Sequence, residues 1–161
     1  MLFESCKKDF FLEKLTEANL DKIPEILSKF VSRKTESETI MRFDTHYTGH
    51  IKIAEIHSDG LIIGNIEDAL NVLGDAYYQG YDGIILYERN ITPDFFDLQT
   101  KLAGEILQKF SNYRIRLVIV GDWSKYTSRS LEAFICESNK GKTVNFSSSP
   151  TEAVKLLSRI N

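Results

Sequence analysis

Two short apolar segments limit the folds available to this chain more than any other feature of its sequence. Residues 83–87, Gly-Ile-Ile-Leu-Tyr, and residues 115–120, Ile-Arg-Leu-Val-Ile-Val, have the length and the isoleucine and valine content typical of strands buried inside a parallel sheet. A helical pattern lies between them, and two parallel strands need a crossover of this kind. The sequence therefore predicts a β-α-β unit.

Further elements flank this unit. Upstream, residues 39–43 and 50–56 are predicted to be antiparallel strands joined by a turn at residues 44–49, and a further short strand is expected at residues 61–63. Helices are predicted from Asn65 to Gly80, over residues 128–139 and from the capping box Ser149-Pro150-Thr151-Glu152 onward, with a short strand over residues 143–146.

The segment between the two apolar strands has the features of a strongly specified helix start. Thr92 can cap a helix, Pro93 suits its first position, and Asp94 and Asp97 would lie near its positive end. Apolar residues then recur at helical spacing as far as Phe110. We therefore expect one helix from Thr92 to Phe110.

This order of elements predicts an α/β fold, a mostly parallel sheet with flanking helices and an antiparallel N-terminal hairpin. The topology is similar to that of STAS domains, the anti-sigma-factor antagonist fold, with a small flavodoxin-like sheet as the alternative. Residues 38–161 would form this domain. Residues 1–37 are predicted to be a short helical N-terminal extension and linker, whose apolar stripe must pack on the main domain, on a second copy or on a partner.

Composition excludes several classes of function. The net charge is −3 and basic residues are interleaved with acids, so we expect no nucleic-acid partner. No apolar run approaches the roughly 20 residues of a membrane helix, which predicts no membrane partner and a cytoplasmic location. Cys6 and Cys136 lack a metal-ligand spacing, and Cys136 is expected to be a small buried apolar residue. With no Gly-rich phosphate loop or Gly-x-Ser-x-Gly elbow, no cofactor is expected.

Four segments carry a resemblance to a known family: residues 88–98, 103–110, 120–126 and 137–141. They resemble the bacterial domain of unknown function 4180 family, and the likeness covers about residues 46–160. Lys101 stands where glycine is usual in that family, and Trp123 stands where phenylalanine is usual. The resemblance implies a family but no activity, because the family itself has none assigned.

A functional edge is predicted where the two central strands end, since ligands of parallel sheets bind outside the carboxyl ends of the strands. The candidate residues of this edge are Glu88, Arg89, Asn90, Thr92, Asp94, Asp97, Asp122, Trp123, Lys125 and Tyr126.

The first interpretation of this edge is a non-enzymatic regulatory module that binds a protein partner around Thr92, Pro93 and Trp123. It rests on the STAS-like topology and on a tryptophan and a tyrosine in a loop expected to be exposed, residues that often anchor interfaces. In STAS domains a Ser or Thr at a helix start is phosphorylated, and Thr92 holds a comparable position as a candidate phospho-acceptor.

The alternative interpretation is a small enzyme or ligand sensor. Glu88, Asp94 and Asp122 would then bind Mg²⁺, with Lys125 beside a phosphate. We favour a structural role for the same residues, in which Asp94 and Asp97 stabilise a helix start, Glu88 pairs with Arg89 or Lys125, and Asp122 orders its own turn. The histidines near the hairpin are expected to be exposed and to bind no metal: His46, His50 and His57.

Overall fold

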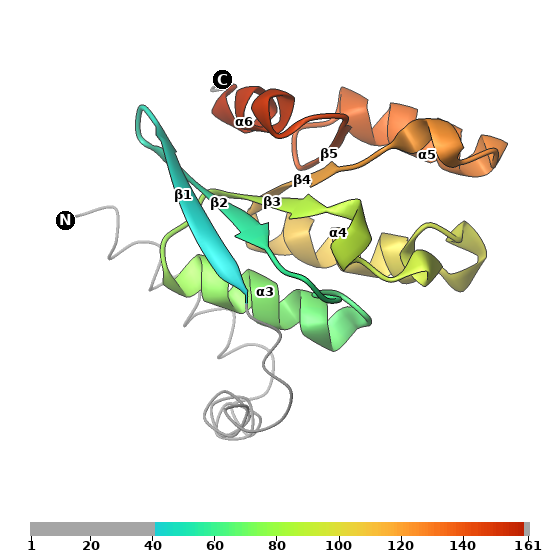
Figure 1. The fold of residues 1–161 in the computed structure, drawn as a ribbon, viewed down its shortest axis with the longest axis horizontal. Helices are drawn as coiled ribbons and strands as arrows, with labels where there is room; N and C mark the ends of the chain where they lie inside the picture. Colours follow the sequence, from blue (N-terminus) through green and yellow to red (C-terminus); the bar gives the residue numbers. More distant parts are fainter. Residues whose placement is uncertain (1–40, 160–161) are drawn as a thin grey trace. The chain divides into compact units, whose positions relative to one another are not determined.

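The computed structural model describes residues 41–159, and the predicted extension over residues 1–37 lies outside them. The described residues form a five-stranded sheet in the order β1-β2-β3-β4-β5, antiparallel between β1 and β2 and parallel from β2 to β5 (Figure 1). The strands are β1 (Arg42–Thr48), β2 (Ile51–His57), β3 (Gly83–Tyr87), β4 (Arg116–Val120) and β5 (Val144–Ser147). The helices are α3 (Ile66–Tyr78), α4 (Leu102–Tyr113), α5 (Arg129–Lys140) and α6 (Pro150–Ser158). The predicted α/β fold class is confirmed.

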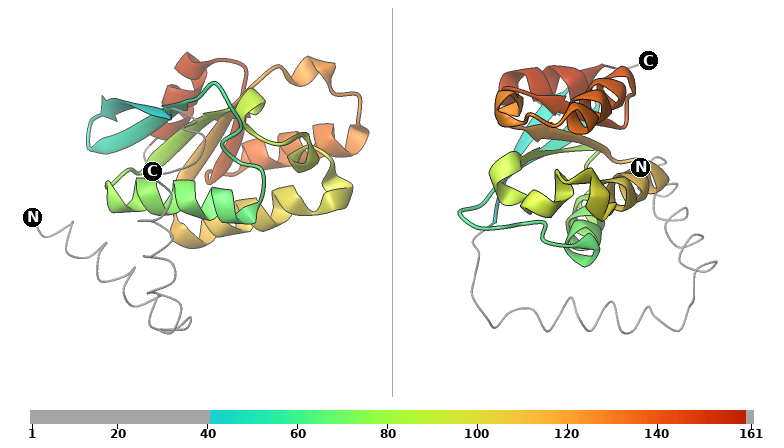
Figure 2. Two further views of the ribbon diagram at one scale, coloured as in Figure 1. Left: turned by 60° about the horizontal axis from the view of Figure 1, so that its bottom comes forward. Right: turned by 90° about the vertical axis from the view of Figure 1, so that its right-hand side faces the viewer.

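The four parallel strands β2 to β5 are largely buried, whereas β1 is partly exposed. Helices α3 and α4 cover one face and α6 covers the other, while α5 runs along β5 (Figure 2). On β3, Ile84 joins the core on the α3 and α4 side and Ile85 joins the core on the α6 side. This division explains why the strand is apolar throughout rather than alternating. A Cβ atom on Gly83 would lie 2.9 Å from a terminal methyl group of Leu157, so a larger residue here would displace that side chain of α6.

The hairpin was predicted with the wrong boundaries. Asp44 and the residues after it were expected to form the turn, but they belong to β1, where Asp44 pairs with Glu55. The turn is the two residues Gly49 and His50, and Gly49 adopts a φ of 61° that suits glycine. The strand expected over residues 61–63 is reduced to a single bridge between Ile63 and Ile91.

The helix expected from Thr92 to Phe110 is also wrong in its first half. Three short 3-10 turns occupy this stretch, η2 (Glu88–Asn90), η3 (Pro93–Phe95) and η4 (Leu98–Thr100), before α4 begins at Leu102. The Thr100 hydroxyl group donates to the carbonyl oxygens of Asp94 and Asp97, each at 2.7 Å. Lys101 then adopts a left-handed φ of 63°, which no continuous right-handed helix can contain.

The predicted caps of the other helices are confirmed. Asn65 accepts a hydrogen bond from the Asp68 amide at 3.0 Å, and Ser149 accepts one from the Glu152 amide at 3.2 Å. Cys136 differs from its prediction, because it lies on the exposed side of α5. Within residues 41–159, no helix combines the length and the apolar character needed to cross a bilayer.

Candidate functional site

Glu88 is the centre of the predicted strand-carboxyl edge. It follows β3 directly, and its side chain is only 11% exposed. Its Oε1 atom accepts a hydrogen bond from the Tyr126 hydroxyl group at 2.5 Å and lies 2.5 Å from Nζ of Lys125. Its Oε2 atom accepts the amide of Asp122 at 3.2 Å. The loops after β3 and β4 therefore meet at one carboxylate, as the sequence predicted for this edge.

A glycine makes room for this carboxylate. A Cβ atom on Gly121 would lie 2.6 Å from Oε2 and 2.7 Å from Cβ of Glu88. Real Cβ atoms do not approach other atoms so closely, so any larger residue at this position would push the Glu88 side chain aside. Gly121 is thus a positioning residue for Glu88.

The turn after Gly121 is ordered by Asp122. Its Oδ1 atom accepts hydrogen bonds from the amide of Ser124 at 3.1 Å and from the hydroxyl group of Ser124 at 2.6 Å. These bonds lower the pKa of the Asp122 carboxyl group. They close the 3-10 turn η5 (Trp123–Lys125), which presents Lys125 to Glu88. Asp122 thus has the turn-ordering role expected of it.

The aromatic residues of the edge are less exposed than predicted. Trp123 is half-buried and packs edge-on against Phe146 of β5, with 5.1 Å between ring centres. Its indole N–H donates a hydrogen bond of 2.9 Å to the carbonyl oxygen of Ser147. Tyr126 packs on Phe96, with 5.4 Å between the ring centres. Burial is the main cause that raises the pKa of Tyr126, and its hydrogen bond to Glu88 raises that pKa further. Together these contacts fix the loop after β4 onto the core.

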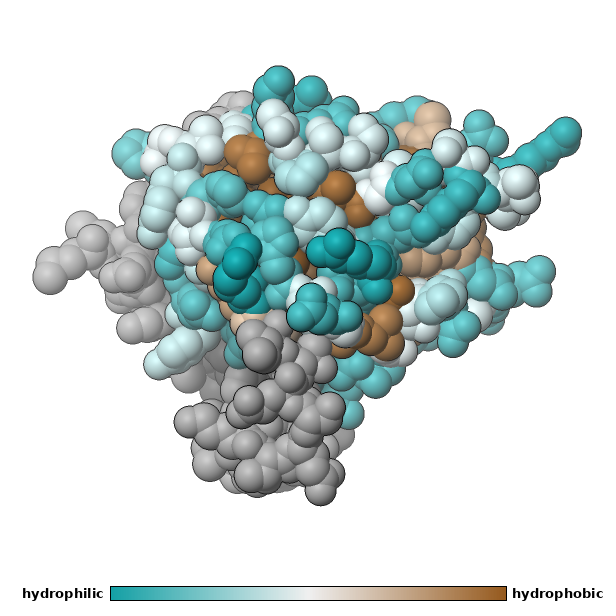
Figure 3. Space-filling view, viewed as in Figure 1, coloured by the Kyte–Doolittle hydropathy of each residue, from teal (hydrophilic) through white to brown (hydrophobic). Residues whose placement is uncertain are grey.

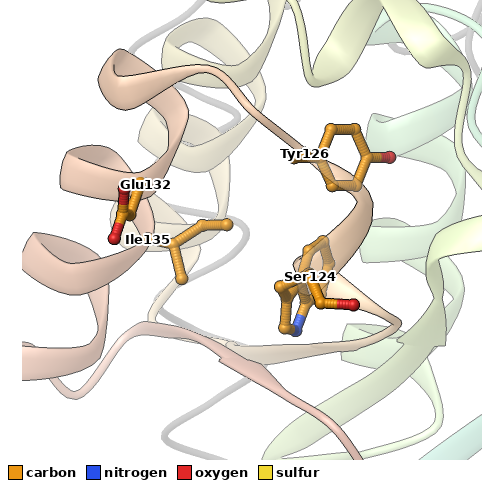
Figure 4. A pocket seen from close by; sticks show the side chains of 5 residues that line it. Ser124, Tyr126, Glu132 and Ile135 are labelled. Carbon is orange, nitrogen blue, oxygen red and sulfur yellow. The ribbon is translucent and has the colours of Figure 1, made fainter.

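An open pocket lies between η5 and the first turns of α5. It has a volume of about 370 Å³ and is lined by Trp123, Ser124, Tyr126, Glu132 and Ile135. Figure 4 shows Glu132 and Ile135 on the α5 side, with Ser124 and Tyr126 on the opposite side of the opening. Apolar surface from three side chains forms its walls, and Glu132 supplies a carboxylate. The pocket suits a ligand with an apolar group and a positive charge.

The other predicted residues of the edge have contacts of their own. The buried Asn90 side chain donates to the carbonyl oxygens of Ser58 and Gly60, at 2.9 and 2.7 Å. Arg89 lies over the Tyr87 ring, with 5.1 Å from its guanidinium carbon to the ring centre. Asn90 therefore joins the loop after β2 to the turn η2 that follows β3.

Thr92 and the two following acids also lie within this loop. Thr92 is only 9% exposed, and its amide donates to Ile63. Asp97 caps η4 by accepting the amide of Gln99 at 3.0 Å, so it orders a 3-10 turn instead of the α-helix start expected for it. Among residues 41–159, no three His, Cys, Asp or Glu side chains are grouped so as to hold a metal ion.

A second polar cluster was missed in the sequence, and it is centred on Glu55 of β2. Glu55 is 7% exposed and accepts a short hydrogen bond from the Tyr87 hydroxyl group. Nε2 of His46 lies 2.6 Å from its Oε2 atom. Nε2 of His57 lies 3.4 Å from its Oε1 atom and 3.2 Å from Asp44. His46 and His57 were expected to be exposed, but they are half-buried partners of these carboxylates.

The surroundings of Glu55 alter the acidity of two groups. Burial alone raises the pKa of Glu55, but the hydrogen bonds from Tyr87 and His46 and the nearby His57 outweigh it, so the pKa is lowered. Burial and the Glu55 carboxylate together raise the pKa of Tyr87 to about 12. The sequence signal for this cluster was an acid in a strand predicted to be buried on both faces, because such an acid needs partners.

The fold and its edge define a class of protein, an α/β domain in which one largely buried carboxylate joins the loops of two parallel strands. Residues 48–157 match the family described as Domain of unknown function (DUF4180), and the chain belongs to that family. A search of curated proteins finds no match. The similarity to STAS domains and the division at residue 38 stay predictions.

Proposed function

We propose that this protein is a non-enzymatic regulatory module that binds a protein partner at its strand-carboxyl edge. The observation that carries this proposal is the open pocket between η5 and α5, with Trp123, Tyr126 and Ile135 on its walls. Such a pocket offers the partly desolvated apolar contact that anchors interfaces. Lys125 and Glu88, the pair that a chemical site would use, are bound to each other.

The pocket also indicates the chemistry of the partner. Its three apolar walls fit one aliphatic or aromatic side chain, and the exposed Glu132 at its edge fits a neighbouring lysine or arginine. The face of the molecule in Figure 3 carries mainly hydrophilic residues with small separate apolar areas, so it offers no broad apolar interface. We therefore infer a short partner segment with one apolar anchor beside a basic residue.

Substitutions in α5 test the apolar half of this proposal. Ile135→Lys places a charge in the pocket, whereas Ala133→Lys adds the same charge to an exposed position two residues away. Tagged wild-type protein and both variants are purified from the native host, and the retained proteins are quantified by mass spectrometry. The proposal requires a stoichiometric partner that Ile135→Lys loses and Ala133→Lys keeps. A partner that both variants retain in full would place the interface elsewhere.

A second pair of substitutions tests whether the carboxylate at the pocket binds a basic residue of the partner. Glu132→Lys reverses the carboxylate at the pocket, and Glu137→Lys reverses an exposed acid on the same helix. We expect Glu132→Lys to weaken binding of the purified partner by about tenfold, the effect of about 1.4 kcal/mol. Equal weakening by the two variants would show that only the overall charge matters.

Phosphorylation of Thr92 remains part of the regulatory proposal, with one structural condition. Because Thr92 is buried, a kinase can reach its hydroxyl group only if the loop from η2 to η4 opens. Intact-mass measurement and fragmentation of protein purified from its host test this step. Phosphate at another residue, or none under any growth condition, would remove Thr92 as the phospho-acceptor.

The Glu55 cluster favours a second candidate function, a small enzyme or ligand sensor at the carboxyl ends of β2 and β3. Its half-buried histidines and buried carboxylate are residue types that serve as general acids and bases in enzymes. A small molecule retained by the wild-type protein and lost on Glu55→Gln would support this candidate. A cytoplasmic location for the protein stays a prediction.

A further inference from the structure

The two edges of the sheet differ in how their main-chain groups are satisfied. At β5, the Asn139 side chain accepts the amide of Phe146 at 2.7 Å and donates to its carbonyl oxygen at 3.1 Å. The Asn139 side chain therefore occupies the outward main-chain groups of Phe146, which opposes the pairing of β5 with another strand.

The other edge is β1, and no described residue pairs with its outer side. The main-chain carbonyl group of Lys52 in β2 points toward the β3 side, where its oxygen accepts a hydrogen bond from the Asp82 amide at 2.7 Å. Its neighbours Ile51 and Ile53 therefore face β1 and bond Thr48 and His46. By alternation, the outward N–H and C=O groups of β1 belong to Phe43, Thr45 and Tyr47.

The sequence of β1 is complementary to itself. In an antiparallel pair centred on Thr45, each Thr45 faces the Thr45 of the second copy, Phe43 faces Tyr47, and Asp44 faces His46. Thr–Thr and aromatic pairs are among the cross-strand pairs that stabilise antiparallel sheets. In the same register, the outward N–H and C=O groups of one copy can form hydrogen bonds with those of the other copy. Tyr47 is 71% exposed and so is available for this contact.

We propose that two copies of this chain associate through β1 as an antiparallel pair, which joins their five-stranded sheets into one continuous sheet. Figure 1 shows β1 as the outermost strand of the sheet. The strand contains neither proline nor lysine, residues that commonly block an exposed edge. The arrangement has two-fold symmetry, so it closes at two copies instead of growing into a fibre.

The expected association is weak and reversible. Seven residues on each side bury less surface than a standard interface of about 1,600 Å². Dimers should therefore form in the micromolar to millimolar range and dissociate on dilution. Sedimentation equilibrium of the full chain over that range measures the association.

Substitution at Thr45 tests the register, because this residue faces itself. Thr45→Lys and Thr45→Glu each place two like charges face to face, so each variant alone should be monomeric. An equimolar mixture should form a heterodimer, because the charges are then opposite. Both variants lose the 2.8 Å hydrogen bond between the Thr45 and Tyr81 hydroxyl groups. Because this bond is also absent in the mixture, its loss cannot explain why the mixture dimerises when each variant alone does not.

Thr151 provides the matched control, as an exposed threonine on α6. Thr151→Lys and Thr151→Glu should dimerise like the wild type. A wild-type chain that stays monomeric over the whole range would overturn the proposal. So would a dimer that both Thr45 variants retain, which would place the contact elsewhere, as in the predicted helices of residues 1–37.

Discussion

The Tyr126 hydroxyl group donates a hydrogen bond of 2.5 Å to Glu88, which links the loop after β4 to the end of β3. Glu88 also pairs with Lys125, one residue before Tyr126. One largely buried acid therefore helps to position the loop that carries the pocket residues Trp123 and Ser124. Changes that displace Glu88 should alter the pocket without touching its walls.

Replacing Gly121 by alanine is the smallest change that displaces Glu88. The added methyl group would lie 2.6 Å from Oε2 of Glu88, so the carboxylate must move away from Lys125 and Tyr126. We expect the free energy of unfolding to fall by about 1–3 kcal/mol, as for overpacking in a well-packed region. Urea denaturation measures it. Gly104→Ala is the control, since its methyl group meets nothing within 4 Å and should raise stability by about 0.5–1 kcal/mol. A Gly121→Ala variant as stable as the wild type would show that Glu88 has room to move.

The lowered pKa of Glu55 predicts acid sensitivity. A group whose pKa is lower in the folded state stabilises the fold above its unfolded value of 4.5, and that stability is lost as the pH falls through the folded pKa. The Glu55→Gln variant lacks this titration. Its stability at neutral pH should be lower than that of the wild type, and the difference should shrink as the pH falls below 4.5. Urea midpoints of both proteins across this range provide the measurement. A difference that is independent of pH would contradict the assigned role of Glu55.

Tyr87 predicts the opposite response at high pH. Its pKa is raised from 10.0 to about 12, so its contribution is complete below pH 10 and is lost as the pH rises toward 12. Tyr87→Phe should remove part of the alkaline loss of stability between these two values. Tyr78→Phe is the control, since Tyr78 is 88% exposed. Tyrosinate absorbance and thermal unfolding are both measured across this pH range. The difference between the wild type and Tyr87→Phe gives the part that belongs to Tyr87. Identical alkaline unfolding of Tyr87→Phe and the wild type would contradict the prediction.

The order of elements could be predicted from the sequence because local signals and burial agree there. The structure contains the strands β3 and β4 that their apolar residues predict. It also contains helices that begin at the predicted caps Asn65 and Ser149. At Thr92 the local signals were misleading. Thr92, Pro93 and the following acids suit a helix start, but the hydrogen bonds of Thr100 and Asp97 close short turns instead.

The site was predicted less completely than the fold. The meeting of Glu88 with Asp122 and Lys125 followed from strand order, because both loops leave the same edge of a parallel sheet. The Glu55 cluster depends on the pairing of β1 with β2, which brings Asp44 and His46 beside Glu55. A shift of one residue in the register of β1 on β2 would move these side chains to the other face of the sheet. The sequence did not define the hairpin turn closely enough to predict the register.

Lys101 offers the last prediction, and it concerns the residue with a left-handed backbone between η4 and α4. Lys101 adopts a φ of 63° between η4 and α4, a conformation that costs a residue with a Cβ atom about 1 kcal/mol. Lys101→Gly should therefore raise the free energy of unfolding, although glycine also gains more freedom in the unfolded chain, so we expect a gain of less than about 1 kcal/mol. Lys109→Gly lies inside α4 and should lower stability by about 1 kcal/mol. Opposite signs for these two substitutions in chemical denaturation would show that α4 begins after Lys101. A loss of stability in both would mean that residue 101 is helical, as a continuous helix from Thr92 requires.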